Sequence, residues 1–148
     1  MNNGVLIIAH APLAHALRQC ALHVFADAGD GVLAVDVHPN APPEESLESA
    51  HLALKQLPGN VLVLTDVFGA TPCNVAQRLV DGISTRLVAG VNLPMLLRAL
   101  TYRGEPLDVM LARAMAGGAQ GVMQVTAIAP QNQSRRTTHD QERHDHQQ

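Results

Sequence analysis

The sequence predicts an α/β fold built on a doubly wound, mostly parallel sheet. Short continuous apolar runs alternate along the chain with longer segments in which apolar residues recur at helical spacing. Such runs are typical of parallel strands that helices cover on both faces. The chain has 148 residues, of which 47% are hydrophobic and 16% charged, so it can form the core of one ordinary domain.

The strands are expected where the apolar runs are rich in β-branched and aliphatic residues. Turn-forming residues separate these runs, among them the cluster at Asp27–Gly31 and the breaker at Pro58–Asn60. The predicted strands are 5–8, 32–37, 61–65 and 85–89, with a short fifth strand at 121–125. The predicted helices follow Pro12, the Pro-rich loop 38–45, Thr71 and Asn92, and a last helix spans 107–116 and ends at Gly117-Gly118.

Several of these helices carry recognisable start signals. Pro12 and Pro72 suit a first helical turn, where the missing N–H of proline is not needed. Thr71 and Asn92 are expected N-caps, because their side-chain oxygens can accept a free amide of the first turn. We therefore expect helices to start directly after the first, third and fourth strands.

Residues 1–129 are predicted to form one domain, and residues 130–148 a disordered polar tail. After Pro130 the chain contains no large apolar residue, so the tail cannot contribute to a core. The histidines of the tail are interpreted as part of a solvated segment rather than as a weak metal site; they are His139, His144 and His146.

Composition and motifs exclude several classes of function. No basic run is interleaved with aromatic residues, so we expect no binding to nucleic acid. No apolar stretch reaches about 18 residues, so we expect no insertion into a membrane. Met1–Gly4 has no basic region of a signal peptide, and we therefore expect a cytoplasmic protein. The glycine and lysine motifs of nucleotide sites and the paired motifs of zinc sites are missing, so no cofactor and no metal are expected. Cys20 and Cys73 are interpreted as buried free thiols.

Two polar residues directly follow apolar strands: His10 after the first strand and Asp66 after the third. In a strand order of 2-1-3-4 these strands are neighbours, and ligands bind where the order reverses. An aspartate beside a histidine fixes its tautomer and leaves the other ring nitrogen as a nucleophile. Helix N-termini and the Thr71 hydroxyl would favour an anion at the same crevice, so together these residues predict a phosphohistidine.

The other histidines are given weaker roles. His38 ends the second strand and is a remote second candidate for the crevice. His15, His23 and His51 fall within predicted helices and are interpreted as partly exposed surface residues. A purely structural reading of His10, as a hydrogen-bonding residue at a strand end, also stays open.

Three segments in this order, "GVLIIAH", "VLVLTDVFGATPCNVA" and "LVAGVNLPMLLRAL", resemble the IIA domain of the mannose-type sugar phosphotransferase system, over about residues 4–125. The resemblance implies a homodimer that exchanges a fifth strand near Gly121–Val125. It implies that the phosphocarrier HPr phosphorylates a histidine, which passes the group to a IIB component. The phosphorylated histidine falls on His10, its orienting aspartate on Asp66 and the hydroxyl residue before proline on Thr71.

The sequence thus predicts a phosphoryl carrier of the phosphoenolpyruvate-dependent phosphotransferase system. Three alternatives stay open at this point. The chain could be the phosphoryl-donor subunit of a dihydroxyacetone kinase, or a regulatory module whose phosphorylation state another protein reads. It could also be a relative of the same fold that only binds small anions.

Overall fold

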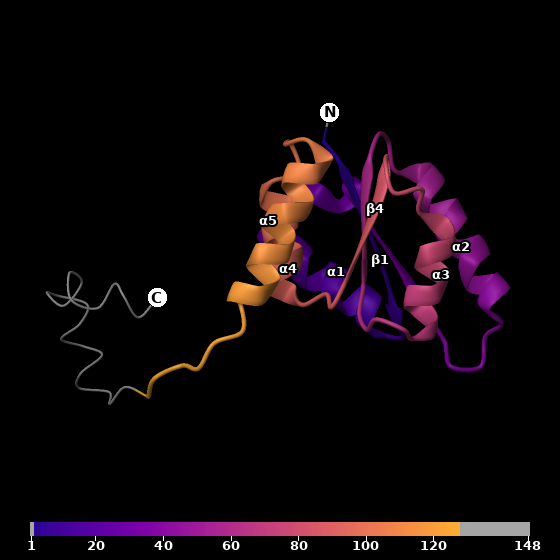
Figure 1. Cartoon of the computed structure of the whole chain (residues 1–148), viewed down its shortest axis with the longest axis horizontal. Helices are drawn as coiled ribbons and strands as arrows, with labels where there is room; N and C mark the ends of the chain where they lie inside the picture. The colour runs from indigo at the N-terminus through magenta and orange to yellow at the C-terminus, as the bar shows by residue number, and fades with distance from the viewer. Residues whose placement is uncertain (1, 128–148) are drawn as a thin grey trace, which may run out of the picture.

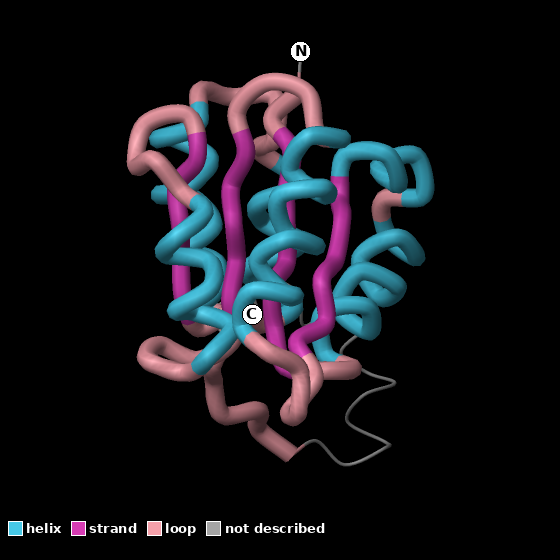
Figure 2. Tube along the Cα trace, turned by 90° about the vertical axis from the view of Figure 1, so that its right-hand side faces the viewer, coloured by secondary structure: helices cyan, strands magenta, loops and turns pink. Residues whose placement is uncertain are grey.

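The computed structural model describes residues 2–127 and contains a four-stranded, all-parallel sheet between two layers of helices (Figure 1). The strand order is β2-β1-β3-β4, which confirms the predicted order 2-1-3-4. Figure 2 shows the strands side by side, with helices across them. The strands are β1 (Gly4–His10), β2 (Val32–Val37), β3 (Val61–Thr65) and β4 (Thr85–Ala89).

The helices divide between the two faces of the sheet. Helices α1, α4 and α5 cover one face, and α2 and α3 cover the other (Figure 1). The bounds are α1 (Leu13–Val24), α2 (Pro43–Gln56), α3 (Thr71–Leu79), α4 (Leu93–Thr101) and α5 (Leu107–Gln120). The predicted turn cluster at 27–31 lies within a short 3₁₀ helix, η1 (Ala26–Gly31).

The central strand β1 contributes to a separate apolar core on each face. Val5 and Ile7 point toward the α1, α4 and α5 layer, and Leu6 and Ile8 point toward α2 and α3. All four side chains are fully buried. Each contributes about 1.5–3 kcal/mol relative to an exposed position. This double burial explains why the run is continuously apolar, and it fixes the end of β1 between its neighbours.

Two of the expected helix boundaries are wrong. Helix α5 continues through Gly117 and Gly118 to Gln120, because these glycines lie against α4 rather than in a turn. A Cβ atom at Gly117 would lie 2.6 Å from the Cβ atom of Arg98. Helix α3 has Ala70 at its N-cap position, so Thr71 is its first residue and not its cap. The expected cap of α4 is confirmed: the Met95 amide donates to Oδ1 of Asn92 at 2.9 Å.

The predicted fifth strand is not formed within this single chain. Residues 122–127 follow α5 without regular structure and are exposed. Val122, Met123 and Val125 remain 78%, 60% and 83% accessible, and β4 stays the last strand of the sheet. Exchange of this segment between two copies remains a prediction.

The expectations for the cysteines and the tail have different outcomes. Cys73 is buried as predicted, whereas Cys20 is exposed, because its place in α1 faces away from the sheet. The polar tail at 130–148 and the proposed domain boundary at 129 lie outside the described residues.

Among the helices of residues 2–127, none has the length and apolar character needed to cross a membrane.

Candidate functional site

The two residues expected to form the site meet at the carboxyl end of the sheet. His10 is the last residue of β1, and Asp66 directly follows β3. These strands are paired, with Ile8 opposite Thr65, so the carboxyl ends of β1 and β3 lie side by side at the edge of the sheet. The strand order reverses at this point, where ligands of open α/β sheets bind.

Asp66 holds His10 through two hydrogen bonds to one carboxylate oxygen. The His10 amide donates to Oδ2 at 3.0 Å, and the ring atom Nδ1 lies 2.7 Å from the same oxygen. An ionised carboxylate can only accept, so Nδ1 carries the proton and Nε2 keeps a free lone pair. The His10 side chain is 49% exposed and that of Asp66 only 8%, so the nucleophilic ring atom belongs to the more accessible partner.

The pKa of the Asp66 carboxyl lies below its usual value. Burial by itself raises this pKa, because it disfavours the charged form. Hydrogen bonds from the amide and ring of His10 outweigh this effect. The Val67 amide adds a third bond, donating to Oδ1 at 2.9 Å. Asp66 is therefore ionised at neutral pH and can hold the tautomer of His10.

The loop after Asp66 leads directly to Thr71. Gly69 has a φ of +89°, which a side chain would strain, and allows the chain to turn back into α3. Val67 and Phe68, the two residues that follow Asp66, are 55% and 77% exposed, and Thr71 is exposed in the first turn of α3. The loop thus brings an apolar surface and a helix N-terminus to the edge of the sheet where His10 ends its strand.

A family model described as "PTS system fructose IIA component" matches residues 4–114 of this chain. The chain belongs to this family. The fructose-specific EIIA component of Bacillus subtilis strain 168 is 33% identical over 103 residues, covering 68% of this chain and 70% of that protein. The mannose-specific EIIAB component of Escherichia coli K12 is 35% identical over 98 residues, 63% of this chain and 30% of that longer protein.

Solved structures confirm the fold of this IIA component. A mannose/sorbose-specific IIA subunit from Enterococcus faecalis superposes with a TM-score of 0.73 at 23% identity, covering 87% of this chain and 98% of that one. A phosphotransferase system EIIA component from Streptococcus agalactiae gives a TM-score of 0.70 at 21% identity, with coverages of 82% and 95%. The chain is therefore a IIA component of the phosphotransferase system with the mannose-type fold.

One feature of the IIA chain was missed by the sequence interpretation. His15, expected to be a simple surface residue, is 61% exposed but pairs with Asp36 of β2 through Nδ1 and Oδ2 at 2.7 Å. The sequence did contain a signal, since Asp36 is the one charged residue in the apolar run of β2. His38, the remote second candidate, lines a groove with His15 and does not belong to the pair at Asp66.

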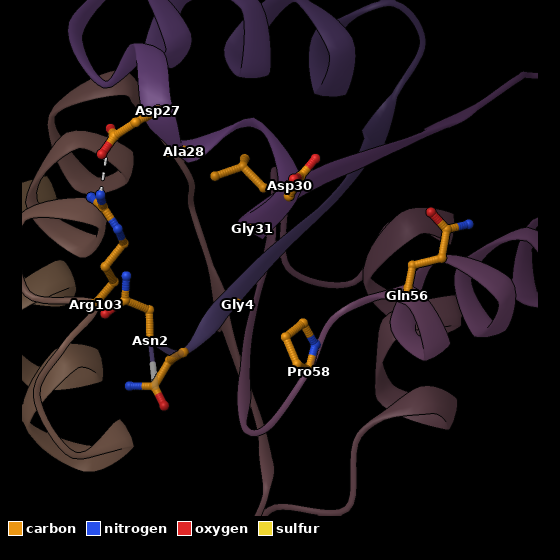
Figure 3. A pocket seen from close by; sticks show the side chains of 11 residues that line it. Asn2, Gly4, Asp27, Ala28, Asp30, Gly31, Gln56, Pro58 and Arg103 are labelled. Atoms are coloured by element: carbon orange, nitrogen blue, oxygen red, sulfur yellow. Dashed lines mark ion pairs between the residues drawn. The ribbon is translucent and has the colours of Figure 1, made fainter.

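A separate cavity of about 280 Å³ lies at the opposite, amino end of the sheet (Figure 3). Gly4 and Val32, the first residues of β1 and β2, form part of its wall. Asp27 and Arg103 form an ion pair at its rim, with an N–O distance of 3.6 Å. Because His10 ends β1 at the other edge, this cavity plays no part in the His10–Asp66 site.

Proposed function

We propose that this chain carries phosphoryl groups on Nε2 of His10, receiving them from phospho-HPr and passing them to a IIB component. The observation that carries the proposal is the bond of Nδ1 to Asp66, which favours the tautomer with its lone pair on Nε2, in a side chain that is half exposed. Membership of the IIA family supports the same assignment. The expected partners are cytoplasmic, and so is the proposed location of this chain.

The proposed reaction is a transfer between two imidazole rings. The lone pair of Nε2 attacks phosphorus, the P–N bond of phospho-HPr breaks, and its electron pair returns to the donor ring. The ionised Asp66 balances the positive charge that develops on the His10 ring. Amides at the starts of α1 and α3, with the Thr71 hydroxyl, are proposed to hold the phosphoryl oxygens.

The exposed loop beside His10 supports docking of a protein donor. Val67 and Phe68 are large exposed apolar side chains in the loop that follows Asp66, and a partner protein docked there would remove them from water. The resemblance also implies a homodimer that exchanges the segment near 121–125, and its exposed apolar residues are consistent with such a contact. We include this homodimer in the proposal.

Two alternatives share this chemistry and differ in the acceptor. One is the phosphoryl-donor subunit of a dihydroxyacetone kinase; the other is a regulatory module that signals through the phosphorylation state of His10. A test with purified IIB protein separates them from the main proposal, because only a carrier for sugar transport releases its label to IIB.

The proposal is tested with labelled phosphoenolpyruvate, enzyme I and HPr. The wild-type chain should take up an acid-labile label rapidly, and His10→Ala should lose that rapid label. His23→Ala is the matched control, because His23 is an exposed histidine at the far end of α1. Uptake by His10→Ala at the wild-type rate and extent would overturn the assignment.

A further inference from the structure

A second histidine–aspartate pair lies on the other side of β1. The His15 amide donates to Oδ1 of Asp36 at 3.2 Å, and Nδ1 of His15 lies 2.7 Å from Oδ2 of the same carboxylate. In the His10–Asp66 pair the corresponding distances are 3.0 and 2.7 Å. In each pair, the backbone amide and Nδ1 of one histidine are both bound to the carboxylate of one aspartate. Asp66 directly follows β3 and Asp36 is the second-last residue of β2, and these two strands flank β1.

The arrangement leaves the second ring ready for the same chemistry. The His15 side chain is 61% exposed, whereas that of Asp36 is 15% exposed. Because the ionised carboxylate accepts from Nδ1–H, the lone pair of His15 lies on Nε2. Asp36 also accepts from the amide of His15, the third residue of α1 and one of the free donors of the helix terminus, and this capping bond does not require a bond to the ring. The ring bond is an additional constraint that fixes the tautomer.

The surroundings of His15 can receive an anionic group. His15 and Asp36 line a groove of about 380 Å³ along β2, which is an edge strand. His38 and Ser49 line the same groove and carry polar hydrogen atoms of the kind that phosphoryl oxygens accept. Within residues 2–127 no group of three metal-ligating side chains is present, so the pair is treated as a two-residue site.

We propose that His15 is a second phosphoryl-accepting histidine of this chain. The donor is an N-phosphorylated imidazole, so the biological source of the phosphoryl group rests on the proposed function. Nε2 of His15 attacks phosphorus, the donor P–N bond breaks, and the electron pair returns to the donor ring nitrogen. The Nδ1 proton stays in the bond to Asp36, whose charge balances the phosphorylated ring.

The first test uses potassium phosphoramidate, which needs neither enzyme I nor HPr. Its P–N bond breaks and ammonia leaves as the histidine is phosphorylated. Phosphorus NMR and site-localised mass spectrometry of the full chain should find His15 phosphorylated about tenfold faster than His23 and His51. These are exposed helical histidines whose side chains make no hydrogen bond within residues 2–127.

Two variants separate nucleophilicity from helix capping. Asp36→Asn should slow phosphorylation of His15 to the rate of His23 and leave that of His10 unchanged. His15→Asn keeps a donor toward Asp36, removes Nε2 and should abolish the second label while the chain stays folded by circular dichroism. The proposal is overturned if wild-type His15 reacts no faster than His23 and His51. Insensitivity of the His15 rate to Asp36→Asn in a folded variant would also overturn it.

The second test identifies the donor with phosphoenolpyruvate, enzyme I and HPr. Label on His15 in the wild type and in His10→Gln supports direct transfer from HPr; label in the wild type alone supports transfer from phospho-His10. Label on His10 without any on His15 contradicts the proposal. If neither histidine is labelled, the function proposed for His10 fails, and the phosphoramidate rates still decide whether His15 is an activated nucleophile.

Discussion

Asp66 binds His10 twice through a single oxygen, Oδ2, which accepts the backbone amide at 3.0 Å and faces Nδ1 at 2.7 Å. The two residues are 56 positions apart in sequence, and the pairing of β1 with β3 brings them together. One side chain therefore fixes both the backbone position and the ring tautomer of the proposed nucleophile.

The first prediction concerns the charge of this pair. Asp66→Asn removes the carboxylate and can place an amide donor against Nδ1, which favours the wrong tautomer. A charge-assisted hydrogen bond contributes about 1.5–3 kcal/mol, so phosphoryl transfer should slow about 10- to 150-fold. Rapid-quench measurement of transfer from phospho-HPr checks this. A wild-type rate, with His10 still labelled, would mean that Asp66 only caps its loop.

Thr71→Ala should slow the same transfer less than Asp66→Asn does. Thr71 is exposed in the first turn of α3 and is not its N-cap, so its removal leaves the backbone amides of that turn in place. We expect a loss below about tenfold, corresponding to one neutral hydrogen bond. Thr101→Ala on α4, away from the site, is the control. A larger loss for Thr71→Ala than for Asp66→Asn would contradict the proposed roles.

Acid should destabilise the chain through two carboxylates with lowered pKa values. Hydrogen bonds from the Ser84 hydroxyl and from backbone amides hold the pKa of Asp81 far below its usual range, and that of Asp66 is also lowered. A lowered folded-state pKa contributes stability above the unfolded-state value, which is lost as the pH falls through the folded-state value. The free energy of unfolding should therefore fall as the pH drops below about 4.

Urea unfolding at several acidic pH values measures this loss. Asp66→Asn and Asp81→Asn should each make the free energy of unfolding less dependent on pH, because each removes one proton uptake on unfolding. Glu48→Gln, at an exposed acid of α2, is the matched control. An unchanged pH dependence in both aspartate variants would refute the prediction.

The segment after α5 should be required for a homodimer. A chain that ends at Gln120 loses the exposed Val122, Met123 and Val125, and it should be monomeric or aggregated. A chain that ends at Pro130 keeps them and should behave as the full chain does. Light scattering distinguishes the species. A stable monomer of the full chain would count against the exchanged strand, because the segment would then have no partner.

Gly117→Ala should destabilise the contact between α4 and α5. The new Cβ atom would lie 2.6 Å from the Cβ atom of Arg98, an atom that cannot move without its helix. The expected loss from this overlap, about 1–3 kcal/mol, exceeds the gain in helix propensity of about 1 kcal/mol. Gly31→Ala is the control, since nothing lies within 4 Å of its Cβ position. Thermal unfolding should show a lower midpoint for Gly117→Ala only.

The sequence by itself determined the four strands of the sheet, and the order 2-1-3-4 that the fold class implies paired the residues of the proposed phosphoryl site. Apolar runs such as Val61–Thr65 need burial on both faces, and this physical requirement is visible in the residues themselves. The proximity of His10 and Asp66 could be predicted, because parallel strands place their carboxyl ends at one edge of the sheet. The start of α4 could also be predicted from neighbouring residues, since the Asn92 side chain caps an amide three residues away.

Only the tertiary structure decided the features that depend on distant neighbours. Gly117 and Gly118 read locally as a helix end, but contact with α4 makes small residues necessary inside α5. His15 is a surface residue, as expected, but only the packing of α1 against β2 shows that Asp36, 21 positions away, lies beside it. Such contacts join side chains whose separation in sequence carries no periodic signal, so their geometry follows only when the sheet and its helices are assembled.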